Sequence, residues 1–97
     1  MIDVDNVWIR GMGDALIRAD SIVVLTQAHD GLRAECISGR MVRLTEGGGP
    51  TNLQLSLLQE MRQASADERW AIVIMPVSAH GTVTWSRERV DTLIDRA

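Results

Sequence analysis

The 97-residue sequence contains no lysine, phenylalanine or tyrosine and only one cysteine. A lone cysteine, Cys36, cannot form an intramolecular disulfide or a multi-cysteine metal site, so we expect a reducing compartment. All ten basic residues are arginine, which is encoded largely by GC-rich codons, whereas the three missing residue types use AT-rich codons. This bias predicts a bacterial or phage source with a high-GC genome.

The sequence also lacks long apolar runs. No uninterrupted apolar stretch approaches the roughly 20 residues that span a bilayer. The acidic N-terminus, residues 1–6, has neither the positive region nor the apolar region of a signal peptide. We therefore expect a cytoplasmic protein that does not contact a membrane.

Dense clusters of basic and aromatic residues are absent as well. The net charge is −3, the arginines are scattered, and the three tryptophans lie far apart in the sequence. Nucleic-acid-binding surfaces normally combine a basic stripe with aromatic platforms. The composition therefore predicts no nucleic-acid partner.

The most prominent feature present is the apolar run of residues 70–75, which carries no polar side chain on either face of an extended strand. Such a run is typical of a strand buried on both sides. The apolar content of 45% and charged content of 24% are those of an ordinary globular protein. We expect residues 1–97 to form a single domain with one core.

The segments upstream of this run predict an antiparallel meander. Residues 7–10 and 15–19 flank a turn at Gly11 to Gly13, and residues 22–25 begin a run of high strand propensity. Residues 32–36 and 41–44 alternate apolar and charged side chains around a turn at Ser38 and Gly39. The side chains expected to face the core are Leu32, Ala34, Cys36, Val42 and Leu44.

Two helices are predicted downstream. Thr51 and Gln54 match a capping box, and the helix from Thr51 to about residues 64–67 has an apolar stripe. Pro76 is expected to end the apolar strand, Ser86 to cap a C-terminal helix, and Trp85 to pack on Val90 across that cap. The two stripes consist of Leu53, Leu57, Leu58 and Met61, and of Val90, Leu93, Ile94 and Ala97.

The predicted fold class is therefore α+β: an antiparallel β-meander of four to six strands, packed by a central helix and a short C-terminal helix.

No residue is assigned a catalytic role, and no metal or cofactor is predicted. His29 and His80 are the only side chains whose unperturbed pKa lies near neutrality, and both have turn-like neighbours. Cys36 falls on the inward register of its strand, which is typical of a packed small hydrophobe. No pair of residues shows metal-ligand spacing such as Cys-x-x-Cys.

One ligand site is predicted around the loop before the central helix. Three glycines allow close backbone approach to an anion, and the following helix start contributes partial positive charge. The alternative is a simple strand-to-helix connection, since Pro50 removes a donor and the Walker-type lysine is missing. The candidate ligand-binding residues are Arg43, Glu46, Gly47, Gly48 and Gly49.

Trp8 is the candidate partner-binding residue, because tryptophan is enriched at interaction hot spots and this one lies on a short terminal strand. The two apolar faces of residues 70–75 predict a homo-oligomer, most simply a dimer. One helix covers one face of a small sheet, and the C-terminal helix is short for the other face. The competing structure is a sheet curled into a small barrel.

Three functions follow from these patterns. The first is a non-catalytic protein-interaction or regulatory module that acts as a homo-oligomer on an unknown protein partner. The second is an oligomer that binds a small ligand or anion near Gly47 to Gly49. The third is a small hydrolase or isomerase that uses His80 in an enclosed pocket.

Overall fold

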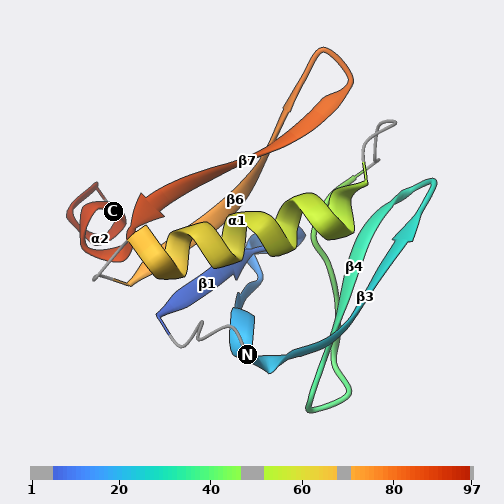
Figure 1. Cartoon of the computed structure of the whole chain (residues 1–97), viewed down its shortest axis with the longest axis horizontal. Coiled ribbons are helices and arrows are strands. Elements are labelled where there is room, and N and C mark those ends of the chain that lie inside the picture. Colours follow the sequence, from blue (N-terminus) through green and yellow to red (C-terminus); the bar gives the residue numbers. More distant parts are fainter. Residues whose placement is uncertain (1–5, 47–51, 68–70, 97) are drawn as a thin grey trace.

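A computed structural model describes residues 6–46, 52–67 and 71–96 of the chain, and Figure 1 shows how their elements are arranged. Two short 3₁₀ turns, Met12–Asp14 and Ala19–Ser21, flank the second strand. The two helices are α1 (Leu53–Asp67) and α2 (Val90–Arg96). The strands are β1 (Val7–Arg10), β2 (Leu16–Arg18), β3 (Ile22–Ala28), β4 (Gly31–Cys36), β5 (Met41–Arg43), β6 (Ile72–Ala79) and β7 (Thr82–Arg89).

These strands form two sheets and confirm the predicted α+β class. One sheet has the order β3-β4-β5 and forms three strands of the antiparallel meander expected from the sequence, whereas the strand expected at residues 15–19 belongs to the other sheet. The other has the order β2-β1-β6-β7, in which β1 and β6 run parallel and the remaining pairs are antiparallel. The apolar run thus supplies a strand in the interior of the larger sheet.

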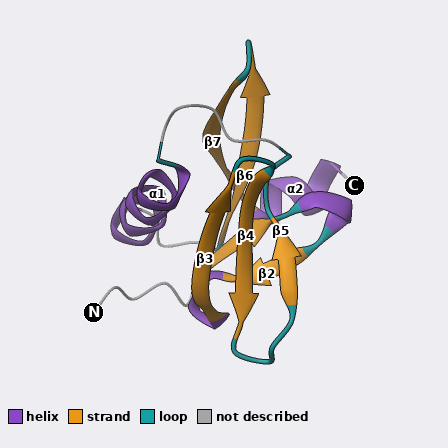
Figure 2. Cartoon of the chain, turned by 90° about the vertical axis from the view of Figure 1, so that its right-hand side faces the viewer, coloured by secondary structure: helices purple, strands orange, loops and turns teal. Residues whose placement is uncertain are grey.

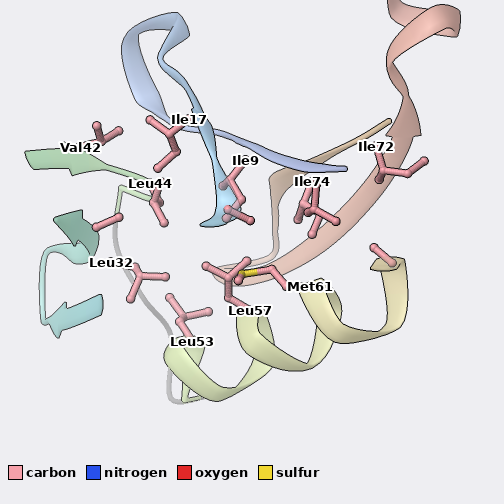
Figure 3. Packing of buried hydrophobic residues seen from close by; sticks show 14 of the residues in the cluster. Ile9, Ile17, Leu32, Val42, Leu44, Leu53, Leu57, Met61, Ile72 and Ile74 are labelled. Carbon is pink, nitrogen blue, oxygen red and sulfur yellow. The ribbon is translucent and has the colours of Figure 1, made fainter. Parts of the chain in front are cut away.

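The core lies between the two sheets and α1. Leu53, Leu57 and Met61 of α1 point towards side chains from both sheets, among them Ile9, Leu44 and Ile74 (Figure 3). The inward register predicted for the meander is confirmed, because each of its five named side chains is buried: Leu32, Ala34, Cys36, Val42 and Leu44.

The predicted start of the central helix is only partly right. Asn52 caps α1, since its Oδ1 accepts a hydrogen bond from the Leu55 N–H at 3.2 Å. Gln54 does not take the capping role but donates from Nε2 to the Leu25 carbonyl at 2.7 Å. Thr51 lies outside the described residues. Leu58, expected in the buried stripe, is 39% exposed, and Ala64 is buried instead.

Pro76 does not end β6 as predicted, because the strand continues to Ala79. The Ile72 N–H donates to the Asn6 carbonyl at 2.9 Å, so the backbone nitrogens of alternate residues face β1. The Pro76 nitrogen points to the same side as that of Ile72, but β1 pairs only with Ile72–Ile74. Its missing donor therefore faces an edge without a partner strand, where proline is tolerated. Trp70 lies outside the described residues.

The prediction that Ser86 caps a helix is wrong. β7 continues to Arg89 and pairs with β6 over eight residues. Trp85 does not pack on Val90 across a cap: its Nε1 donates to Ser56 Oγ of α1 at 3.0 Å. Arg87, two residues on, pairs with Glu60 of α1 at 2.7 Å. Polar residues that signal a helix start locally therefore belong to a strand whose inner face contacts α1.

The two helices lie on opposite sides of the strands (Figure 2). In the described part of the chain, no helix is long and apolar enough to cross a membrane.

Candidate functional site

The four-stranded sheet has a core face and an outer face, and successive side chains along β1 alternate between them. Val7, Ile9 and Ile17 are buried on the core face. The intervening residues point the other way, because successive side chains in a strand alternate between faces. In the register of the sheet, Trp8 on β1 lies beside Val73 on β6 and Arg18 on β2. The tryptophan chosen from the sequence thus shares a face with the apolar strand.

Part of this outer face is hollowed into a groove of about 460 Å³. α2 borders the groove, since Val90 and Ile94 line it together with residues of β1, β2 and β6. We call the apolar lining residues the Trp8 face: Trp8, Leu16, Ala71, Val73, Val90 and Ile94. Val73 is buried, whereas Leu16 and Ile94 are exposed. The short helix therefore covers this side of the sheet only in part, as the sequence predicts.

The charged groups at the groove neutralise one another. Arg10 Nη2 lies 3.0 Å from Asp14 Oδ1, and both residues line the groove. Arg18 Nη2 lies 2.8 Å from Asp20 Oδ2, and the Arg18 guanidinium lies over the Trp8 ring, 5.9 Å from its centroid. These exposed ion pairs contribute little to stability. Each of these two pairs places one positive and one negative charge beside the apolar part of the groove.

Of the predicted ligand site, the structure describes only Arg43 and Glu46. Arg43 contacts Asp30 Oδ2, and Arg33 contacts the same oxygen at 2.8 Å. Glu46 is exposed. Gly47, Gly48 and Gly49 lie outside the described residues, so the predicted site is untested.

The Asp30 cluster also shifts a pKa. Partial burial raises the pKa of Asp30, but the attraction of Arg33 and Arg43, helped by a backbone hydrogen bond, outweighs it, so the pKa is lowered from 3.8. The carboxylate stays charged and holds the hairpin of β3 and β4 to β5. Its arrangement is that of a structural ion-pair cluster.

The residues considered for catalysis are dispersed. His80 occupies the exposed turn between β6 and β7, where its φ of 53° and the φ of 76° at Gly81 are those of a tight type I′ turn. His29 is exposed in the β3–β4 turn, and Cys36 is a buried free thiol on β4. The described lining of the groove contains none of the three.

Neither a metal site nor a basic stripe emerges from the part of the chain that the structure describes. It contains no group of three or more His, Cys, Asp or Glu side chains placed to hold a metal ion. Six of the ten arginines pair with carboxylates within this part: Arg10, Arg18, Arg33, Arg43, Arg87 and Arg89.

The sequence singled out Trp8 as a candidate, but not the residues that the structure places beside it. Leu16 joins it through the local pairing of β1 with β2, whereas Val73 and Ile94 join it only through the parallel pairing of β1 with β6 and the placement of α2, which no local pattern encodes. The signal available in the sequence was the alternation of side chains along each strand. Trp8 and Arg10 lie on one face of β1, and their partners across the turn, Arg18 and Leu16, lie on the same face of β2.

Comparisons of the chain with protein-family models, with curated proteins and with solved structures find no match in any of the three.

Proposed function

We propose that the chain is a small non-catalytic interaction module that acts as a homo-oligomer, most simply a dimer, through the Trp8 face. The observation that carries the proposal is the position of Trp8 beside Val73 on a sheet face that α2 covers only in part. An aromatic anchor within a mainly apolar groove, with its charges paired, resembles the usual composition of an interface centre.

A second copy of the chain is the partner that best fits this surface. An isologous contact places the same patch on both sides of the interface, so the patch must complement itself. A face with balanced rim charges meets this condition, since Arg10 and Asp14 of one copy find groups of both signs in the other. The cytoplasmic location expected from the single cysteine remains part of this proposal.

Binding of a small apolar ligand in the same groove is a second candidate, because a volume of about 460 Å³ falls within the range of ligand pockets. The hydrolase hypothesis has less support, since His80 is exposed at a hairpin tip. The ligand and dimer hypotheses differ in one observable. A dimer changes mass with protein concentration, whereas a ligand raises the melting temperature without changing the mass.

Light scattering coupled to size exclusion, over a wide dilution range, tests the dimer. We expect the mass of two chains at high micromolar concentration and a fall towards one chain on dilution. Leu16→Asp should abolish the dimer, because Leu16 is 50% exposed in the groove and the substitution places a charge there. Ile37→Asp is the matched control, since Ile37 is 80% exposed outside the groove. A mass of one chain at every concentration refutes the proposal.

A further inference from the structure

A second exposed apolar surface lies between β3 and α1 and shares no lining residue with the Trp8 face. Val23 and Leu55 are 57% and 61% exposed, and Val24 and Leu58 are also exposed. The hollow between the two elements measures about 400 Å³. We call it the β3/α1 groove, and its lining residues are Ile22, Val23, Val24, Leu25, Gln54, Leu55 and Leu58.

The strand side of this groove is a sheet edge. β3 is the terminal strand of the β3-β4-β5 sheet, so within the described residues its outer edge pairs with no strand. The Leu25 carbonyl points away from β4, because it accepts from Gln54 Nε2 at 2.7 Å. The Leu25 N–H lies on the same side of the strand and is a donor for an added chain. Exposed edges of this kind pair with extended segments of other chains.

The helix side of the groove adds an apolar stripe that ends in a positive charge. Leu55, Leu58 and Arg62 follow one another at three- and four-residue spacing along α1, and a hollow adjoining the groove is lined by all three and Gln59. Arg62 makes no ion pair with any side chain that the structure describes. Neither hollow has a carboxylate in its described lining.

We propose that the β3/α1 groove binds an extended, acidic segment of a partner protein, which adds as a strand to the edge of β3. An apolar side chain of this segment packs between the valines of β3 and the leucines of α1. A carboxylate near one of its ends pairs with Arg62. The β3 edge beside α1 suits strand addition, because main-chain hydrogen bonds to β3 supply affinity and the apolar pocket against α1 supplies specificity.

Charge complementarity favours a different protein over a second copy of this chain. In a two-fold contact through this groove, the partner presents the same lining residues. That lining has no carboxylate for Arg62 among the described residues, and the nearby acid on α1, Glu60, is paired with Arg87. The surface is therefore independent of the proposed self-association through the Trp8 face.

Selection from phage-displayed random linear peptides on the full chain tests the proposal. We expect enrichment of peptides that combine a branched apolar residue with Asp or Glu at a fixed spacing. Leu58→Asp should weaken binding of an enriched synthetic peptide by about tenfold or more, as for loss of a hot-spot residue. Arg62→Glu should weaken it by about tenfold, since it turns an attraction into a repulsion. Gln63→Ala, on an exposed part of the same helix, is the control and should bind as the wild type does.

Amide hydrogen exchange by NMR reports the binding mode. The enriched peptide should slow exchange of the Leu25 N–H, and a copy N-methylated along its backbone should lose binding. Trp8→Ala should bind the peptide as the wild type does, which separates this result from failure of the dimer. Failure to enrich any peptide, enrichment of basic or helical peptides, or an unprotected Leu25 N–H would each overturn the proposal.

Discussion

Trp8 on β1 and Val73 on β6 are register partners in the parallel strand pair at the centre of the larger sheet, and both point away from α1. Val73 is buried while Trp8 is half-buried, so Trp8 is the more accessible of the two. This relationship joins two separate predictions from the sequence, a partner-binding Trp8 and an apolar strand with one uncovered face, into one surface.

The first prediction concerns the environment of Trp8. If the Trp8 face forms the dimer, Trp8 loses water contact on association, and its fluorescence emission should move to shorter wavelength as the protein concentration rises. Trp8→Phe should reduce this shift by the contribution of Trp8, whereas Trp85→Phe should leave it unchanged, because Trp85 donates to Ser56 of α1 on the opposite side of the sheet. A shift of the same size in Trp8→Phe and the wild type would contradict the burial of Trp8 in the interface.

The second prediction concerns the buried stripe of α1. Leu57 is fully buried among residues of both sheets, so Leu57→Ala should lower the free energy of unfolding by about 2 to 5 kcal/mol through lost burial and the cavity left behind. Gln59→Ala should be nearly silent because Gln59 is exposed. Urea unfolding measures both, and equal effects would contradict the packing of α1.

The third prediction tests how closely the two sheets approach. A Cβ at Gly11 would lie 2.9 Å from the Arg43 carbonyl oxygen, a backbone atom, and 2.9 Å from Val42 Cγ1. Gly11→Ala should therefore destabilise the protein by about 1 to 3 kcal/mol, as overpacking does. Thermal unfolding compared with Met12→Ala, an exposed position in the same turn, provides the measurement. An unchanged melting temperature in Gly11→Ala would show that β5 is not packed against this turn.

Much of the fold was predictable because local pattern and tertiary environment agree. Leu32, Ala34 and Cys36 alternate with charged residues, and a strand with one buried face imposes that period. Likewise, the four-residue spacing of Leu53, Leu57 and Met61, close to one helical turn, predicted the face of α1 that packs. For these residues of β4 and α1, burial follows from the position of each residue in the strand or helix repeat.

The errors arose where long-range pairing overrides a local signal. Ser86 and Glu88 resemble a helix start, but β7 pairs with β6 along its whole length, and Arg87 is accommodated by Glu60 of α1. Pro76 resembles a strand end, but β1 has already ended beside it. Both outcomes depend on which strands become neighbours, and that information is not local. The grouping of Val73 and Ile94 with Trp8 was hidden for the same reason.

The fourth prediction concerns acid stability. Arg33 and Arg43 hold the pKa of Asp30 below 3.8, so the unfolded chain takes up this proton first as the pH falls. The stabilisation from Asp30 is therefore present above about pH 4 and is lost as the pH falls through the lowered pKa. In urea titrations, Asp30→Asn should be less stable than the wild type at pH 7, and the difference should shrink below pH 4. Arg43→Gln should remove part of the same pH dependence.

The last prediction concerns Trp85, whose Nε1 donates to Ser56 Oγ at 3.0 Å and so joins β7 to α1. In a double-mutant cycle, Trp85→Phe and Ser56→Ala should show a coupling energy of about 0.5 to 1.5 kcal/mol, the usual net value of one hydrogen bond. The cycle is needed because Trp85→Phe also removes ring volume, and Ser56→Ala also raises helix propensity.

The control cycle pairs Trp85→Phe with Gln63→Ala, which lies on an exposed part of α1 and should be additive within about 0.5 kcal/mol. The result discriminates between two architectures for residues 85–90. If Trp85 preceded a helix capped by Ser86 and packed on Val90, it would not contact Ser56, and the two substitutions would be additive. A measurable coupling requires β7 to extend past Ser86 with its inner face against α1, which is the arrangement that leaves the opposite side of the sheet open around Trp8.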